Sequence, residues 1–178
     1  MAVALEDDAP QPMPLIREER PADFDAVREV LLAAFGREAE SLLVERLRAA
    51  AKVTVSLVAE EHGRVLGHVL FSTISIDTGG MEQPAIALAP LAVLPAFQRL
   101  GIGSALVSAG LAGLRERRAA RVLVMGDPGY YARFGFAPAS RFAVRSPFPA
   151  PEAAFMALEL QAGAFSACAG IARYGPEF

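Results

Sequence analysis

Two stretches of almost unbroken apolar sequence, PAIALAPLAVLP (84–95) and RVLVMGD (121–127), constrain the fold of this chain most strongly. A strand that is apolar on both faces has to be covered on both faces, which favours a sheet between two layers of helices. Pro90 lies inside the first stretch, where proline has no N–H to give to a neighbouring strand. The Ala89–Pro90 pair is therefore predicted to form a bulge or a point where the strand leaves its neighbour.

The other segments predict helices and strands in a fixed order around these two strands. Apolar residues recur every three or four positions over 21–36 and 37–50, which indicates two helices. Two β-rich runs within 54–77 flank the polar turn EEHGR and predict a hairpin. The remaining expected elements are a strand over 15–20, helices over 98–119 and 128–136, and strands within 141–146, 153–160 and 167–174. The order β-αα-βββ-α-β-α-ββ predicts one α/β domain with a mixed sheet over 15–178, after a disordered arm over 1–14.

Composition excludes several classes of function. A net charge of -3 gives no reason to expect nucleic-acid binding, which depends on clustered positive charge. The single cysteine, Cys168, cannot form an intrachain disulfide and is typical of a reducing compartment. Two histidines without a metal-ligand spacing predict no metal site. The acidic N-terminus is unlike a secretory signal, and no apolar run approaches the ~18 residues that span a membrane, so a cytoplasmic protein is expected.

The segment LPAFQRLGIGSALVSAG (94–110) places glycines where a strand ends and a helix begins. Such a turn can present free backbone N–H groups and the positive end of a helix dipole to a phosphate. The dinucleotide fingerprint is excluded because G-I-G-S-A-L lacks its third glycine, and no G-x-x-x-x-G-K-[ST] loop occurs. Glycine destabilises the first turn of a helix, so Gly101 and Gly103 favour a ligand that approaches closely. A purely structural turn stays open.

The residues at this turn match a known family. LAVLPAFQRLGIGSALV resembles the acyl-coenzyme A signature of the GNAT N-acetyltransferases, in which a strand is followed by Q/R-x-x-G-x-G/A and a helix. About thirty residues further on, YYARFGF resembles the Y-x-x-x-G-F helix of the same superfamily, and the order of elements agrees over about 15–160. APLAVLP, GDPGYYARFGF and the closing Y-x-P-x-F are similar to the small bacterial N-acetyltransferases of the YhbS type.

The resemblance implies a fold with two splayed central strands and acetyl-CoA as the donor, whose pantetheine arm enters between those strands. It implies that the N–H of Leu91 faces the thioester carbonyl and that Val93 pairs with the pantetheine amides. The N–H groups of 99–104 would hold the pyrophosphate, with added charge from Arg99. The implied cofactor-binding residues are Leu91, Ala92, Val93, Gln98, Arg99, Leu100, Gly101, Ile102, Gly103 and Ser104.

The implied reaction is direct attack of a primary amine on the thioester, which releases CoA. Tyr131 occupies the family's general-acid position, and a phenol with a pKa near 10 keeps its proton at neutral pH. The alternative is that Tyr131 is an aromatic residue packed in the core. Asp127 precedes Pro128 and is expected to cap a helix. The family often has an asparagine near this strand end that contacts the cofactor, so a contact from Asp127 is the second interpretation.

The general base and the acceptor are not assigned by the sequence. Glu82, Ser72 and Ser75 are candidates for the base, whereas His68 is interpreted as a packed strand residue. The acceptor is expected to be a small-molecule or peptide amine, and the segments that shape acceptor sites are 21–50, TGGMEQ and RSPFPAPEAA. No nucleic-acid or membrane partner is expected, and a homodimer is left open. The second function hypothesis is a non-catalytic module that binds acyl-CoA as a sensor or in an interaction.

Overall fold

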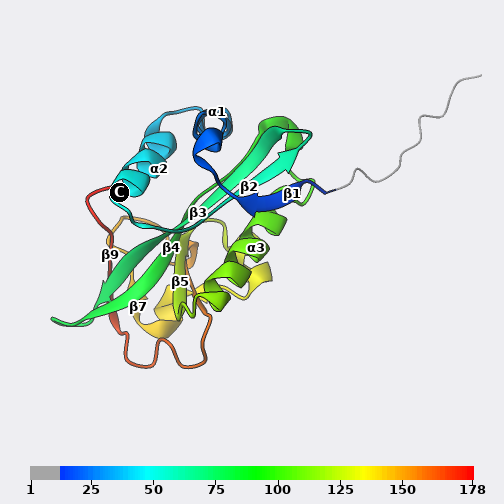
Figure 1. Cartoon of the computed structure of the whole chain (residues 1–178). Coiled ribbons are helices and arrows are strands. Elements are labelled where there is room, and N and C mark those ends of the chain that lie inside the picture. The colour runs from blue at the N-terminus through cyan, green and yellow to red at the C-terminus, as the bar shows by residue number, and fades with distance from the viewer. Residues whose placement is uncertain (1–12) are drawn as a thin grey trace, which may run out of the picture.

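The two apolar stretches form neighbouring parallel strands inside one mixed sheet (Figure 1). The computed structural model describes residues 13–178, in which nine strands form the sheet. The strand order is β1-β2-β3-β4-β5-β8-β6, while β9 pairs with β3 and with β7. Only β4 with β5 and β7 with β9 run parallel among the described strands. The mixed α/β fold predicted from the sequence is confirmed.

The bounds of the elements follow the predicted order closely. The strands are β1 (Leu15–Glu18), β2 (Val53–Glu61), β3 (Arg64–Asp77), β4 (Glu82–Val93), β5 (Arg121–Met125), β6 (Ala137–Pro138), β7 (Val144–Arg145), β8 (Phe155–Glu159) and β9 (Gly170–Arg173). The helices are α1 (Phe24–Phe35), α2 (Ala39–Ala49), α3 (Ile102–Glu116) and α4 (Pro128–Tyr131). Short 3-10 turns cover Pro21–Asp23, Pro95–Phe97, Ala132–Phe134, Ala139–Phe142 and Glu152–Ala154.

The two central strands separate partway along their length. Pairing between β4 and β5 runs from Ile86 opposite Val122 to Leu88 opposite Val124 and then stops. On the other side of β4 the register shifts, because Val69 of β3 faces Leu91 whereas Phe71 faces Leu88. The extra residue in β4 lies at Ala89–Pro90, a cis peptide. Proline cannot complete the ladder there, so the bulge and the splay predicted from Pro90 are confirmed.

Side chains that alternate along β5 divide the interior into clusters on the two faces of the sheet. Val122 and Val124 pack with the apolar side of α3, including Leu106. Leu123, which points the other way, packs with Phe155 and the C-terminal segments. On that same second face, Leu70 of β3 packs under α1 and α2. Figure 1 shows α3 on one side of the sheet and the α1–α2 pair on the other. Different elements therefore cover the two faces of the sheet beside the gap between β4 and β5.

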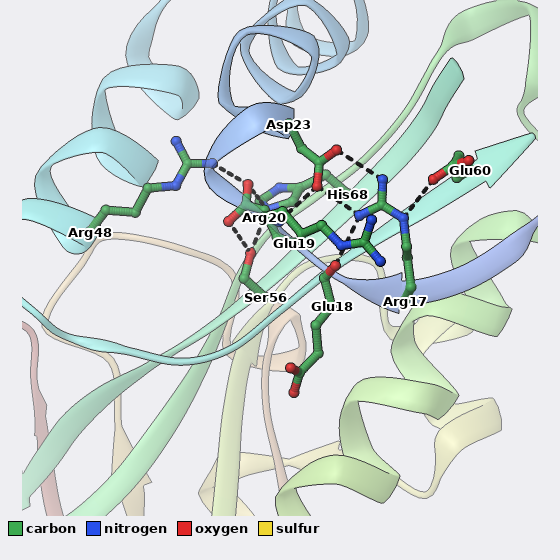
Figure 2. A network of polar contacts seen from close by, with 9 residues as sticks. All are labelled: Arg17, Glu18, Glu19, Arg20, Asp23, Arg48, Ser56, Glu60 and His68. Atoms are coloured by element: carbon green, nitrogen blue, oxygen red, sulfur yellow. Dashed lines mark hydrogen bonds and ion pairs between the residues drawn. The ribbon is translucent and has the colours of Figure 1, made fainter. Parts of the chain in front are cut away.

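A buried polar network fastens β1 and α2 to the sheet on the α1–α2 face (Figure 2). The hydroxyl of Ser56 donates to Glu19 at 2.8 Å and lies 2.9 Å from Nε2 of His68. Glu19 also pairs with Arg48. Because Ser56 gives its one proton to the carboxylate, His68 has to donate from Nε2. His68 is fully buried, which agrees with its interpretation as a packed strand residue.

We expect His68 to make the protein lose stability as the pH falls from about 6.5 to about 3. Burial, with a smaller contribution from the Arg48 cation, lowers the pKa of His68 to about 3. In the unfolded chain His68 takes up a proton near pH 6.5, whereas in the folded chain it stays neutral down to about pH 3. Over that window the free energy of unfolding should fall by about 1.4 kcal/mol per pH unit from this one proton. Urea unfolding at a series of pH values measures this slope.

The variant His68→Gln keeps a side-chain donor for Ser56 but does not titrate, so its slope should be flatter by that amount. His62 lies exposed at the β2–β3 turn, and His62→Asn is the matched control that should keep the wild-type slope. Equal slopes for His68→Gln and the wild type would exclude His68 as the source. Asp23 adds a separate loss at lower pH, because its bond to Arg17 lowers the pKa of Asp23 to about 2. That loss falls between about pH 3.8 and pH 2.

Four details of the elements differ from the prediction or lie outside the described residues. The helix predicted over 98–119 begins only at Ile102, because Gly101 has a left-handed backbone with φ 88° and precedes the first turn. The strand predicted over 141–146 is reduced to Val144–Arg145, because a 3-10 turn ends at Ala143 with φ 55°. The two-residue strand β6 carried no sequence signal. The arm predicted over 1–14 lies outside the described residues, apart from Met13 and Pro14.

Candidate active site

The free edge of β4 beyond the bulge is the first component of the candidate site. Leu94 donates its N–H to Leu66 of β3 at 2.9 Å. Backbone groups alternate in direction along a strand, so the N–H groups of Val93 and Leu91 point to the opposite edge. No described strand pairs with β4 on that edge beyond Leu88. Leu91 and Val93 thus direct polar backbone groups into the splay, whereas Ala92 is 3% exposed and bonds toward β3.

The start of α3 is the second component. The first helical hydrogen bond runs from the N–H of Ala105 to the carbonyl of Gly101 at 3.0 Å. The N–H groups of Ile102, Gly103 and Ser104 therefore have no acceptor inside the helix, and no side chain caps this end. Arg99 and Leu100 are exposed in the preceding turn. The start of α3 therefore has free N–H groups of the kind that can bind an anion.

Gln98, one of the predicted cofactor-binding residues, also has a contact within the protein. Its side-chain Nε2 donates to the carbonyl of Val93 at 3.0 Å and so ties the turn to the end of β4. That bond uses the carbonyl of Val93 and leaves its N–H free. Among the predicted cofactor residues, Gln98 is thus a group that fixes the loop against the strand.

These two components line one cleft with residues of α4 and the following turn. The cleft has a volume of about 510 Å³, and its walls include Leu91, Gly103, Ser104, Tyr130 and Arg133. A side chain at Gly103 would begin 2.8 Å from the hydroxyl oxygen of Tyr130, so only glycine lets the two segments approach this closely. The guanidinium of Arg133 lies 4.7 Å from the centre of the Tyr130 ring. Tyr130 thus lines the cleft beside Gly103 and Arg133.

Tyr131 lies behind this wall, at the end of β5. Its ring packs 5.0 Å from that of Tyr130 and 5.7 Å from that of Phe136. A Cβ atom at Gly126 would lie 2.4 Å from the Tyr131 ring, so the glycine that ends β5 makes room for the tyrosine. Tyr131 is 8% exposed, and burial, with a smaller effect of Tyr130, raises the pKa of Tyr131 above its usual value. The phenol therefore stays protonated at neutral pH.

Asp127 caps α4, as its position before Pro128 predicts. Its Oδ1 atom accepts the N–H of Gly129 at 2.8 Å, and its carbonyl accepts the N–H groups of Tyr130 and Tyr131 at 3.1 Å. The cap therefore sets the start of the helix that holds both tyrosines. A side chain that accepts the same bond should replace Asp127 without changing this geometry.

Replacing Asp127 by Ala is expected to lower the free energy of unfolding by about 1 kcal/mol, because the Gly129 N–H loses its acceptor. Asp127→Asn should retain most of the stability, since asparagine is an equally good cap. Chemical denaturation of the three proteins measures the difference. If Asp127→Ala were as stable as the wild type while Asp127→Asn were not, the capping role would be wrong.

The candidates for the general base do not lie at the splay. Glu82 begins β4 nine residues before Leu91, a separation of about 30 Å along a strand. Ser75 donates its hydroxyl to Glu82 at that same far end. Ser72 is fully buried in the middle of β3, opposite Ala87. The predictions for Glu82 and Ser75 are wrong because β3 and β4 are long strands whose other ends form the site.

The remaining candidate features carry no chemistry of their own. Cys168 is 2% exposed, and its thiol lies against the guanidinium of Arg121, which agrees with a buried structural residue. Within residues 13–178 no group of three or more His, Cys, Asp or Glu side chains could hold a metal ion. None of the helices described in that range has the length and apolar character needed to cross a membrane.

Comparison with known proteins agrees with this geometry. The family model of the acetyltransferase (GNAT) domain matches residues 15–139. The uncharacterized N-acetyltransferase YhbS of Escherichia coli (strain K12) is 36% identical over 165 residues, which cover 92% of this chain and 98% of that protein.

Two solved structures resemble the whole chain. The crystal structure of YhbS from Escherichia coli in complex with CoA has a TM-score of 0.89 at 34% identity, covering 97% of this chain and 96% of that one. A GNAT family acetyltransferase from Brucella melitensis in complex with acetyl-CoA has a TM-score of 0.76 at 40% identity, covering 92% and 97%. Both the sequence and the fold are thus shared over nearly the full length, and this chain belongs to the GNAT acetyltransferase family.

Proposed function

We propose that this protein transfers an acetyl group from acetyl-CoA to a primary amine, with the cofactor held between β4 and the start of α3. The observation that carries the proposal is the cleft lined jointly by the free edge of β4 and the uncapped N-terminus of α3. Relatives of similar length with the same fold are described in complex with CoA and with acetyl-CoA, which supports the assignment of the ligand.

Three parts of the cofactor, its pyrophosphate, its pantetheine arm and its thioester, would have a matching group in the cleft. The pyrophosphate would accept hydrogen bonds from N–H groups of 99–104, where the helix dipole and the Arg99 cation favour negative charge. The pantetheine amide would pair with the N–H of Val93 in place of a neighbouring strand. The thioester carbonyl would then lie near the N–H of Leu91, just after the bulge. Leu100 and Ile102 shape the loop, and Ala92 fixes the edge to β3.

The chemistry follows from the direction of these groups. The amine lone pair attacks the thioester carbon, and the N–H of Leu91 stabilises the negative charge that develops on the carbonyl oxygen. When the carbon–sulfur bond breaks, the thiolate takes a proton from the hydroxyl of Tyr131. The amine loses its extra proton to water or to a group on the acceptor side. No covalent enzyme intermediate is needed, because the amine itself is the nucleophile.

Two assays together test the proposal. Isothermal titration should give one molecule of acetyl-CoA bound per chain, and free thiol should be released when a panel of primary amines is added. Binding without thiol release from any amine would favour the second function, an acyl-CoA sensor or interaction module. Absence of binding would exclude both functions and leave the glycine turn as a structural element. Gel filtration with light scattering, run on the same sample, tests whether the protein is a homodimer.

A further inference from the structure

A second cavity lies on the face of the sheet opposite the cofactor cleft. Its volume is about 520 Å³, within the range of small-molecule sites, and it is formed wholly by the connection from β6 to β8 and by the first residue of β8. Val144 and Phe155, which line it, belong to the cluster packed on the second face. Leu91 and Tyr130 of the cofactor cleft pack with the α3 cluster on the first face.

The second cavity adjoins the strand end at which the cofactor cleft also ends. Phe155, in its wall, pairs with Met125 at the end of β5. Gly126, the residue that follows β5, donates its N–H to the carbonyl of Ala154 at 2.9 Å. The cavity is therefore one strand spacing, about 4.8 Å, from the residues that bound the splay. A donor on one face and an acceptor on the other would meet in the gap between β4 and β5.

The charges in this cavity are one cation and one anion. Arg145 and Glu152 both line it, and both are exposed. Neither forms an ion pair or a side-chain hydrogen bond with any residue in 13–178, whereas Asp77 and Arg173 pair at 2.8 Å. Glu152 opens the 3-10 turn that leads directly to Ala154, so it lies at the end nearest β5. Arg145, on β7, lies at the other end of the connection.

We infer that this cavity binds the acceptor, and that the acceptor is a small amine that also carries a carboxylate, such as an amino acid. Arg145 pairs with the carboxylate, because a guanidinium matches that group with two parallel hydrogen bonds. Glu152 pairs with the ammonium end, which places the amine next to the splay. Phe148 and Phe155 contact the apolar part of the molecule. This inference rests on the proposed function, since the second cavity becomes an acceptor site only if the first binds acetyl-CoA.

The test uses matched pairs of acceptors that differ only in the carboxylate. L-phenylalanine and phenethylamine, L-lysine and cadaverine, and L-serine and ethanolamine give pairs with apolar, basic and polar side chains. For at least one pair, kcat/KM should be about 10-fold or more higher for the amino acid. Arg145→Gln should remove that preference by raising KM for the amino acid, with KM for acetyl-CoA unchanged. Arg141→Gln is the matched control, because Arg141 is an exposed arginine in the same connection but outside the cavity.

The outcomes separate this inference from the proposed function. If acetyl-CoA binds but no carboxylate-bearing amine is acetylated, the acceptor inference is wrong and the cofactor assignment stands. The inference is equally overturned if the decarboxylated amine is preferred in every pair, or if Arg145→Gln weakens both members of a pair alike. If acetyl-CoA does not bind to the wild type, both proposals fail. Thermal melting of each variant confirms that a change in KM does not reflect partial unfolding.

Discussion

Replacing Tyr131 by Phe is expected to lower kcat for acetyl transfer by about 100-fold or more, because the departing thiolate loses its proton donor. The dissociation constant of acetyl-CoA should stay within about two-fold of the wild-type value, since the ring and its packing on Gly126 and Phe136 remain. Steady-state thiol release gives kcat, and isothermal titration gives the affinity. The separation of the two quantities is what distinguishes a proton donor from a packing residue.

The matched control for this change is Tyr174→Phe. Tyr174 is the remaining tyrosine outside α4, and it packs with Phe148 and Phe178 on the other face of the sheet. Burial raises the pKa of Tyr174 as it does that of Tyr131, so the two substitutions remove similar hydroxyl groups from different places. Tyr174→Phe should keep kcat near the wild-type value. If Tyr131→Phe also kept it, Tyr131 would not be the general acid.

Replacing Gly103 by Glu is expected to weaken acetyl-CoA binding by about 100-fold or more. A carboxylate at this position carries the same sign of charge as the pyrophosphate, and placing like charges together in an interface costs several kcal/mol of binding free energy. Because about 1.4 kcal/mol changes the affinity tenfold, this cost corresponds to a loss of about 100-fold or more. The new side chain would also begin 2.8 Å from the hydroxyl of Tyr130, so the Tyr130 side chain has to shift. Isothermal titration measures the loss directly.

Ser108→Glu is the control for added negative charge on the same helix. Ser108 is exposed one and a half turns further along α3, away from the cleft. Its substitution should leave the affinity for acetyl-CoA within about two-fold of the wild type, since an exposed charge at that distance is screened by salt. If acetyl-CoA still protected Gly103→Glu against heat as it protects Ser108→Glu, the start of α3 would not be the pyrophosphate site.

The fold could be predicted from the sequence because its strongest signals are local. The apolar stretches of β4 and β5, the helical spacing of α1 and α2, and the hairpin turn at Gly63 each specify an element without reference to the rest of the chain. Pro90 even predicted the splay, since a residue without an N–H has one physical consequence inside a strand. The short elements of the connection from β6 to β8 could not be predicted from the sequence, because they depend on tertiary contacts. The strand β7, for example, is formed by its pairing with β9.

The parts of the candidate site that a sequence motif specifies could be predicted. The parts whose position depends on how far along a strand a residue lies could not be predicted. The glycine turn follows from residue spacing and lines the cleft, whereas Tyr131, which the same kind of spacing singles out, packs behind Tyr130. Glu82 and Ser75 were wrong because hydropathy cannot tell which end of a long strand forms the site. Arg145 and Glu152 lie in the segment RSPFPAPEAA, which was expected to shape the acceptor site, but no spacing marks them as a pair, because they line one cavity only once the connection from β6 to β8 has folded. The close approach of Tyr130 to Gly103 is visible only when α3 and α4 are packed together.

The central claim is that the cleft between β4 and α3 delivers an acetyl group from acetyl-CoA to an amine. The most direct test is a reaction of the purified full-length chain with acetyl-CoA and an amine panel, in which mass spectrometry of the amines is combined with thiol quantification. The account predicts an amine that gains the mass of one acetyl group, with one free thiol released per amine modified, and loss of both signals in Gly103→Glu. Acetyl-CoA that binds and is recovered intact with every amine would contradict it.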